Sequence, residues 1–384
     1  MSANSSSTRE ENYICSKPFT WFEVANETSD NEKGEVFLCC PTWLEKSIGN
    51  LQHQSVEEIW NSEEAQAIRS TILGGSFKFC NYSRCTFLQN KYGPVQKIKD
   101  IKDPYLREVI DKELTFLPYG PREINCSYDA SCNLSCPSCR SDLIIENENK
   151  DAILSIQEKI QNSTLKDARL LSITGSGDPF GSPFFRKWLQ SMKRVNMPDL
   201  EVIHLHTNAL LWNQRTWNSI PRDIQEIIKS AEISIDASTP TTYSINRRGG
   251  NFKTLLKNLE FISSLRKNEP LDYVRISMVV QENNFLEMTD FISICEKYKF
   301  DEVYFSKIVN WGTYSEEEYK SIAIHLPSHP RHYEFLQFLR KQIVPLTRRS
   351  NSGIRNLMIK LFTLNHVKHP IINLGSLSEL LKIN

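Results

Sequence analysis

The sequence lacks a net charge, because its 46 lysines and arginines equal its 46 aspartates and glutamates. A balanced chain gives no support for nucleic acid or an anionic membrane surface as the main partner. The first residues, Met1 to Asn12, are polar and lack the apolar core of a secretion signal. No apolar run approaches the length of a membrane span. We therefore expect a cytoplasmic protein that binds neither nucleic acid nor membrane.

Internal repeats and low-complexity segments are lacking as well. What the chain does have is 384 residues, enough for two domains, and ten cysteines. Disulfides are not expected, because the cytoplasm is reducing. The cysteines are grouped along the sequence, which favours metal or cluster ligation over scattered buried thiols.

Strand and helix patterns alternate from Glu123 onward. The predicted strands are Glu123–Ser127, Leu170–Thr174, Glu201–Thr207, Glu232–Asp236, Tyr273–Val280 and Glu302–Ile308. The helical patterns between them include Ala152–Gln161, Pro183–Arg194, Phe252–Ser264 and Leu286–Tyr298. This alternation predicts an α/β fold with a parallel sheet, and six strands rather than eight predict a partial, open (β/α)6 barrel. In such folds the chemistry lies at the carboxyl ends of the strands.

The sequence divides into four predicted parts. Residues 1–99 form a small, cysteine-rich α+β domain, with strands at Phe19–Val24 and Glu35–Cys39 and a helix at Ser55–Ile72 that a capping box begins. Residues 100–122 are a charged linker, residues 123–325 the partial barrel, and residues 326–384 a C-terminal segment that begins as helix.

Three cysteines follow the first barrel strand in the spacing C-x3-C-x2-C: Cys132, Cys136 and Cys139. Three thiolates on one loop are one too few for a closed tetrahedral metal site. In a four-iron cubane cluster, three cysteines leave one iron open to a small molecule. The alternatives are a structural zinc knuckle or buried cysteines, although zinc loops usually pair cysteines as C-x2-C and need a fourth ligand nearby.

Polar motifs follow the later strands too. Ser176, Gly177 and Asp178 follow the second strand, where glycines allow close backbone approach and a carboxylate suits an ammonium group. The alternative there is an ordinary Gly-Asp-Pro turn.

Asn208 follows the third strand, and Ser234 and Asp236 end the fourth. Short polar side chains at strand ends suit the hydroxyls of a ribose. The guanidinium of Arg247, a little further on, is a natural partner for a carboxylate.

These motifs, in strand order over Glu123 to Ile308, resemble the radical S-adenosylmethionine (SAM) enzymes. The resemblance implies that Cys132, Cys136 and Cys139 hold a catalytic 4Fe–4S cluster whose open iron binds the amino and carboxylate groups of SAM. It implies that Ser234 and Arg247 bind this cofactor, and that Ser176-Gly177-Asp178 replaces the family's Gly-Gly-Glu. Asn208 and Asp236 are further candidates. The implied chemistry is one-electron cleavage of SAM to a 5′-deoxyadenosyl radical, with flavodoxin or ferredoxin as electron donor.

The N-terminal segment carries a second group of cysteines. A G-x4-C element ends at Cys39, and a C-x4-C element joins Cys80 and Cys85. This succession resembles the SPASM or shorter twitch domain of peptide-modifying radical SAM enzymes, although there it usually follows the barrel. The resemblance implies an auxiliary 4Fe–4S cluster. Adjacent cysteines of an extended segment point oppositely, and the G-x4-C spacing favours Cys39 over Cys40. The predicted ligands are Cys15, Cys39, Cys80 and Cys85, with a structural zinc site as the alternative.

These expectations leave three functional hypotheses. The first is a radical SAM enzyme that abstracts hydrogen from a peptide or protein, in a modification, maturation or epimerisation reaction. The second is the same chemistry on a sugar, a nucleotide sugar or another small metabolite. The third is a non-catalytic metal-binding protein, which would keep its metal without cleaving SAM.

Overall fold

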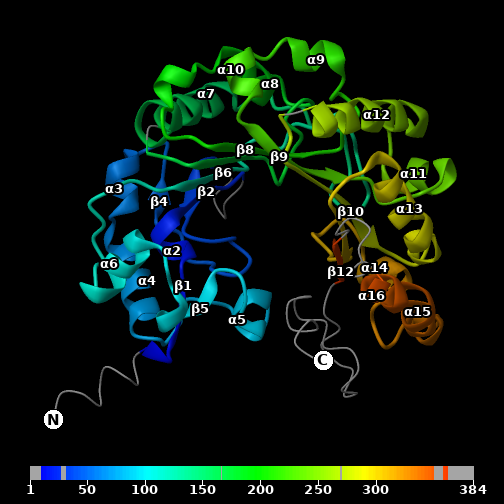
Figure 1. Cartoon of the computed structure of the whole chain (residues 1–384), viewed down its shortest axis with the longest axis horizontal. Coiled ribbons are helices and arrows are strands. Elements are labelled where there is room, and N and C mark those ends of the chain that lie inside the picture. Colours follow the sequence, from blue (N-terminus) through cyan, green and yellow to red (C-terminus); the bar gives the residue numbers. More distant parts are fainter. Residues whose placement is uncertain (1–9, 27–31, 166, 269, 350–357, 362–384) are drawn as a thin grey trace. The chain divides into compact units, whose positions relative to one another are not determined.

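The computed structural model describes residues 10–26, 32–165, 167–268, 270–349 and 358–361. Within them the chain forms two compact units. Unit 1 comprises the described residues of Met1–Ala130, Glu146–Ser176 and Met192–Ile203, and unit 2 comprises those of Ser131–Ile145, Gly177–Ser191 and His204–Asn384. Figure 1 labels most of the helices and strands.

Unit 1 contains a five-stranded arrangement that joins the first segment of the chain to the predicted barrel strands. Its order is β7 (Leu170–Ile173), β6 (Glu123–Cys126), β2 (Trp21–Val24), β3 (Glu35–Phe37) and β4 (Gly49–Asn50). Strand β6 pairs in parallel with both β7 and β2, whereas β2–β3 and β3–β4 are antiparallel. A strand from residues 1–99 therefore extends the parallel part of the sheet, which the sequence did not predict.

The rest of unit 1 is a small sheet with short helices. Strands β1 (Tyr13–Cys15) and β5 (Val95–Lys97) pair antiparallel. The helices are α2 (Lys17–Thr20), α3 (Val56–Trp60), α4 (Glu63–Leu73), α5 (Thr86–Asn90), the 3-10 turn η1 (Ile98–Asp100), α6 (Pro104–Asp111), α7 (Lys150–Lys159), the π-helical turn η2 (Ile160–Thr164) and the 3-10 turn η3 (Arg194–Asn196). Helix α6 occupies the predicted linker, because Asp103 caps it and its apolar side is buried.

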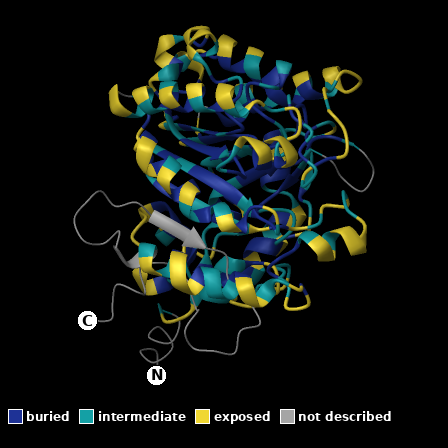
Figure 2. Cartoon of the chain, turned by 90° about the vertical axis from the view of Figure 1, so that its right-hand side faces the viewer, coloured by how far each residue is buried: buried dark blue, intermediate teal, exposed yellow. Residues whose placement is uncertain are grey.

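Unit 2 is built on four parallel strands. Strands β9 (Ile228–Ser234), β10 (Tyr273–Val280), β11 (Glu302–Lys307) and β12 (Met358–Leu361) are neighbours in that order. Helix α13 (Met288–Tyr298) packs on β11 and on α12 (Phe252–Asn268). Most residues of β9 and β10 and half of those of β11 are buried, and Figure 2 shows exposed residues on the outer faces of the helices. Leu255, Leu259 and Ile262 recur at helical spacing and are buried on one face of α12.

The remaining elements of unit 2 are short. They are α8 (Pro183–Ser191), α9 (Gln214–Asn218), α10 (Arg222–Gln225), α11 (Pro240–Asn246), η4 (Phe285–Glu287), α14 (Glu316–Ile322), α15 (His332–Phe338), η5 (Leu339–Ile343) and α16 (Val344–Arg349). Strand β8 (Val202–Thr207) begins in unit 1 and ends in unit 2. No helix in the described ranges is long and apolar enough to cross a membrane.

The six strands predicted from the sequence are all present, as β6 to β11, and helices alternate with them. The α/β class with parallel strands is therefore confirmed. Four of the strands differ from the prediction by one residue at one end. The fourth differs at both ends: it was predicted as Glu232–Asp236, but β9 spans Ile228–Ser234. Asp236 has a φ of 61°, in the left-handed region, which extended backbone does not occupy. Much of the predicted C-terminal segment, residues 350–357 and 362–384, lies outside the described residues.

Candidate active site

The three cysteines Cys132, Cys136 and Cys139 lie in unit 2, on a loop that its own backbone closes. The Cys132 N–H donates to the Ile144 carbonyl over 2.9 Å, which joins the two arms of the loop. The N–H groups of Cys139 and Arg140 both donate to the Cys136 carbonyl, over 2.9 and 3.0 Å. The loop is thus an ordered turn that brings the three side chains into one region.

Each of the three sulfur atoms has a side-chain N–H donor. Asn208 Nδ2 lies 3.6 Å from Cys132 Sγ, Arg247 Nη1 lies 3.6 Å from Cys136 Sγ, and Arg140 Nη2 lies 3.5 Å from Cys139 Sγ. Two of the three donors are cationic guanidinium groups. Such donors stabilise a thiolate, which is the form of cysteine that binds metal. The sequence predicted Asn208 and Arg247 as contacts of the cofactor, and it missed Arg140, whose only signal is its position next to Cys139.

Burial opposes this stabilisation of the thiolate form at two of the three cysteines. It raises the pKa of Cys132 to about 12, and it raises the pKa of Cys136 although Arg247 lowers it in part. Both thiols are therefore protonated at neutral pH when nothing is bound. A metal or cluster that binds them must displace these protons, so binding is coupled to proton release.

Asp178 fixes the position of Asn208. Its carboxylate accepts hydrogen bonds from the Thr207 hydroxyl and the Asn208 N–H, each over 2.8 Å. It also accepts from the N–H groups of Phe180 and Gly181, over 2.9 and 2.8 Å. Only 1% of the residue is exposed. These contacts favour a positioning role for Asp178; the predicted contact with an ammonium group stays a prediction.

The other two residues of the predicted Ser176-Gly177-Asp178 element are divided between the units. Ser176 belongs to unit 1, where its hydroxyl donates to the Ser127 carbonyl over 2.6 Å, and Gly177 begins the next segment of unit 2. The structure therefore brings Asp178 into the network around the cysteine loop.

A glycine that the sequence analysis did not single out allows the loop to approach Asp178. A Cβ atom at Gly181 would lie 2.8 Å from Asn133 Oδ1 and 2.9 Å from the Asn133 nitrogen. The second of these is a backbone atom, so the clash would not be relieved by a change of rotamer. Asn133 Oδ1 in turn accepts from Asn208 Nδ2 over 3.0 Å. Glycine at this position therefore permits the contact between the cysteine loop and Asn208.

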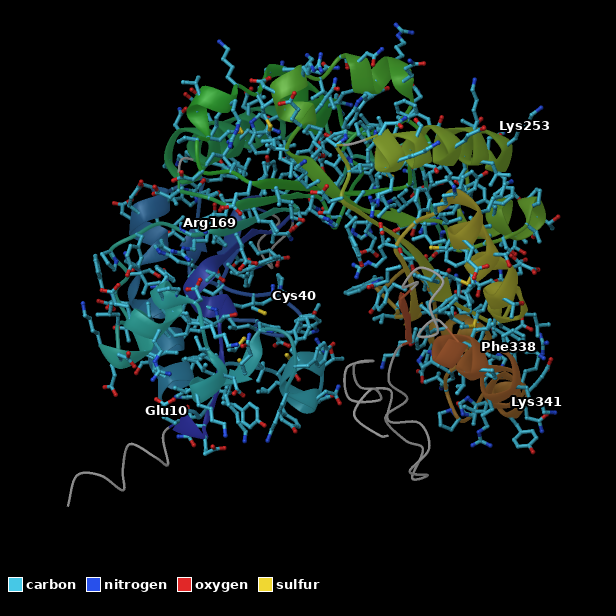
Figure 3. The ribbon with its side chains drawn as sticks, viewed as in Figure 1. Glu10, Cys40, Arg169, Lys253, Phe338 and Lys341 are labelled. Carbon is cyan, nitrogen blue, oxygen red and sulfur yellow. The ribbon has the colours of Figure 1, made fainter. Side chains whose placement is uncertain are left out.

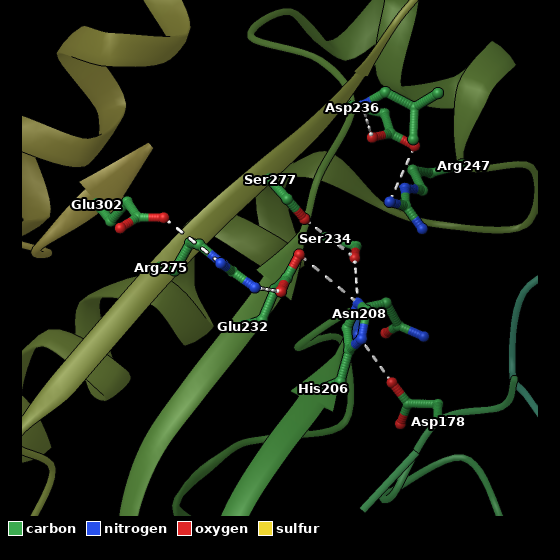
Figure 4. Close-up of polar contacts among 11 residues, drawn as sticks. Asp178, His206, Asn208, Glu232, Ser234, Asp236, Arg247, Arg275, Ser277 and Glu302 are labelled. Atoms are coloured by element: carbon green, nitrogen blue, oxygen red, sulfur yellow. Dashed lines mark hydrogen bonds and ion pairs between the residues drawn. The ribbon is translucent and has the colours of Figure 1, made fainter. Parts of the chain in front are cut away.

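Asp236 and Arg247 form a buried ion pair beside Cys136. Arg247 Nη2 lies 2.9 Å from Asp236 Oδ2, with side-chain exposures of 12% and 2%. Burial raises the pKa of Asp236, and Arg247 counteracts it. The second carboxylate oxygen accepts from the Val279 N–H over 2.7 Å. Arg247 thus bridges Cys136 and Asp236, as Figure 4 shows for the carboxylate end.

Ser234 lies in a polar network formed by side chains of strands β8, β9 and β10. Its hydroxyl is 2.9 Å from His206 Nε2 and 3.3 Å from the Ser277 hydroxyl (Figure 4). Glu232 lies 3.9 Å from the same histidine nitrogen and is bonded to Arg275. Burial raises the pKa of Glu232, but His206 and Arg275 outweigh it and hold the pKa at about 2.

The sequence analysis missed His206, Glu232 and Arg275 as members of this network. The signal was available in the alternation along the strands. On β8 the buried Ile203 and Leu205 alternate with histidines, and the same alternation places Glu232 beside Ser234 on one side of β9.

The second group of cysteines lies in unit 1 around one small cavity. Cys15, Cys39, Cys80 and Cys85 all line it, and its volume is about 20 Å³. Its other lining residues are mostly apolar: Lys17, Pro18, Trp43, Leu44, Phe77, Phe87, Leu88 and Val95. Burial raises the pKa of Cys15 to about 12 and of Cys80 to about 11.

Cys40 differs from these four cysteines. It is not among the residues that line the cavity, and its sulfur lies 3.1 Å from the Thr42 hydroxyl. Figure 3 labels this side chain in unit 1. Among the described residues, no three His, Cys, Asp or Glu side chains converge as the ligands of a single metal ion do. A cubane cluster spaces its thiolates more widely, because each one binds a different iron.

Comparison with known proteins gives one family model and several solved structures. Residues 15–86 match the model of the SPASM domain, an iron–sulfur cluster-binding domain. This match includes all four cysteines of the cavity and confirms the resemblance predicted for the N-terminal segment. A search of the curated proteins found no match.

The similar solved structures are distant. SuiB from Streptococcus suis is 14% identical, with 67% of this chain and 52% of that chain covered and a TM-score of 0.43. The same protein bound to S-adenosylmethionine is 16% identical, with coverages of 79% and 62% and a TM-score of 0.43. Native anSMEcpe with bound AdoMet is 16% identical, with coverages of 62% and 64% and a TM-score of 0.43. The chain thus spans between half and two thirds of the length of these proteins.

Proposed function

We propose that this chain is a radical SAM enzyme that abstracts a hydrogen atom from a peptide or protein substrate. The observation that carries the proposal is the C-x3-C-x2-C loop in which every sulfur has an N–H donor, from Asn208, Arg247 and Arg140. Three thiolates with such donors suit a cluster that keeps one iron open for the cofactor. When bound, the cluster supplies the electron that cleaves the carbon–sulfur bond of SAM.

The residues around the loop have defined tasks in this proposal. Cys132, Cys136 and Cys139 hold the cluster. Arg247, already bonded to Asp236, is placed to receive a carboxylate next to Cys136. Asn208 and the hydroxyl of Ser234 offer hydrogen bonds to the polar groups of the cofactor. Ser176 and Gly177 belong to the proposed cofactor contacts through their place in the sequence motif, and Asp178 positions Asn208.

The four cysteines of unit 1 hold an auxiliary 4Fe–4S cluster in this proposal. The SPASM match over residues 15–86 and the shared cavity of Cys15, Cys39, Cys80 and Cys85 support it. A closed four-cysteine cluster offers no open iron, so a role in electron relay or in structure is preferred. Both clusters need a reducing compartment, which supports a cytoplasmic enzyme supplied by a flavodoxin or ferredoxin.

A peptide is preferred as substrate because of the SPASM match, a domain type that accompanies peptide-modifying enzymes of this superfamily. A sugar or nucleotide sugar is the second candidate. The polar side chains of β8, β9 and β10 support a sugar substrate. His206, Glu232 and Arg275 carry the donors and acceptors that sugar hydroxyls require.

Deuterium transfer distinguishes these substrates. Short peptides encoded beside the gene are produced in perdeuterated form and incubated without oxygen with the reconstituted protein, SAM and dithionite. The proposal expects deuterium in the 5′-deoxyadenosine that forms, as measured by mass spectrometry. Deuterium from a labelled nucleotide sugar, with none from any peptide, would overturn the peptide assignment and leave the radical chemistry in place.

A further inference from the structure

Arg140 is held beside the cysteine loop by the main chain of the loop itself. It directly follows Cys139, and its N–H donates to the Cys136 carbonyl over 3.0 Å. Only 8% of the residue is exposed, and its Nη2 lies 3.5 Å from Cys139 Sγ. Cys139 is the exposed cysteine of the three. A buried cation is therefore fixed against the ligand position that is nearest to solvent.

The charge of Arg140 reaches beyond the sulfur that it contacts. Arg140 interacts electrostatically with Cys139 and also with Cys132 and Cys136. The second cation at the loop, Arg247, also pairs with Asp236 over 2.9 Å and shares its charge with that carboxylate. Arg140 thus lies within electrostatic range of all three thiolates that would ligate a cluster.

We infer that Arg140 raises the reduction potential of the cluster held by Cys132, Cys136 and Cys139. The inference rests on the proposed function. One-electron reduction adds one negative charge to the cluster and neither forms nor breaks a bond. A fixed guanidinium stabilises the reduced form more than the oxidised form, and charges and hydrogen bonds at the sulfurs are among the factors that set such potentials. Arg140 acts through the ligands and is a positioning residue.

The test compares two arginines that contact the same loop. Arg140 is replaced by Gln and, separately, by Lys. Arg248 is the matched control, because it is exposed and bonds to the Ser135 hydroxyl and the Ser141 carbonyl rather than to a sulfur. Each full-length protein is reconstituted, its iron and sulfide are counted, and it is titrated with dithionite while the reduced cluster is followed by electron paramagnetic resonance. The signal of the loop is the one that a Cys136→Ala variant lacks.

The inference expects a more negative midpoint potential for Arg140→Gln at unchanged iron content, a smaller shift for Arg140→Lys, and the wild-type value for Arg248→Gln. A wild-type potential in Arg140→Gln would overturn it. If Arg140→Gln binds no cluster at the loop, Arg140→Lys decides: a small negative shift supports the inference, and a midpoint potential at or above the wild-type value contradicts it. A wild-type protein that takes up no iron overturns the proposed function itself and is recognised before any titration.

Discussion

Asp178 shows how one carboxylate organises the candidate site at the scale of a residue. Its two oxygens accept four hydrogen bonds. Two come from Phe180 and Gly181, close to Asp178 in the chain, and two come from Thr207 and Asn208 at the end of β8. Since Asn208 then reaches Cys132 and Asn133, the carboxylate acts on the cysteine loop through one intermediate side chain.

Replacing Asp178 by Asn tests this role. The amide keeps one acceptor oxygen but turns two N–H groups toward existing donors, so buried donors lose their partners. We expect the free energy of unfolding to fall by about 2 kcal/mol, from the usual cost of unsatisfied buried groups. Urea denaturation followed by circular dichroism measures the change. Asp142→Asn, on the exposed part of the same loop, is the control; equal stabilities of the two variants would contradict the assignment.

His204 gives a prediction about pH. Burial lowers its pKa from 6.5 to about 4, so the folded protein holds it neutral where the unfolded chain binds a proton. Its contribution is complete above pH 6.5 and is lost as the pH falls from 6.5 toward 4. The loss between pH 7 and pH 5 is on the order of 2 kcal/mol. In His204→Gln the difference between unfolding free energies at these two pH values should shrink by that amount; an unchanged difference would show that His204 titrates normally.

At the scale of elements, the first part of the chain shows where local patterns mislead. The apolar spacing over Ser55–Ile72 predicts one helix, but the structure has α3 and α4, separated at Asn61 and Ser62. The Ser62 side chain accepts from the Ala65 N–H and begins a second helix. Asn61 bonds instead to Leu117, which is distant in sequence, and to Arg69 of α4. A side chain that finds such partners competes with the helical backbone, and periodicity alone does not reveal it.

Substitution of Ser62 measures this second cap. Ser62→Ala removes the acceptor for the Ala65 N–H and should lower the free energy of unfolding by about 1 kcal/mol. Ser62→Gly should cost only a few tenths of a kcal/mol, because glycine leaves room for water at the helix terminus. Denaturant titrations of both variants supply the comparison. If the alanine variant were as stable as the wild type, the hydrogen bond between Ser62 and the Ala65 N–H would not stabilise the start of α4.

The strands were predicted better than the other elements. Of the residues at the candidate site, some were predicted and others were missed. Tyr273–Val280 is recovered residue for residue as β10, because an apolar parallel strand bounded by polar residues leaves little freedom of register. Asn208 was found because it follows a strand end, and Arg247 because the family resemblance implies an arginine a little beyond the fourth strand. Arg140 and Gly181 were missed. The place of Arg140 beside Cys139 does not show that its side chain turns back to the Cys139 sulfur, and the importance of Gly181 comes from its contact with Asn133, which is distant in sequence.

At the scale of the whole molecule, the proposed function requires one iron–sulfur cluster in each unit. Each 4Fe–4S cluster has four irons, so the reconstituted wild type should contain about eight irons per chain. Cys80→Ala removes one of the four thiols of the unit 1 cavity and should reduce the count to about four. Cys40→Ala is the matched control and should keep the wild-type content, because this thiol is bonded to Thr42 outside the cavity lining. Iron loss in Cys40→Ala would move the ligand from Cys39 to its neighbour.

The most direct test of the central claim is the formation of 5′-deoxyadenosine. The protein is purified and reconstituted without oxygen, incubated with SAM and dithionite, and analysed by mass spectrometry beside Cys136→Ala. The account predicts 5′-deoxyadenosine from the wild type and none from the variant, with the unit 1 cluster still present in both. A wild type that carries zinc instead of iron, or equal product from the two proteins, would contradict the claim that the three-cysteine loop cleaves SAM.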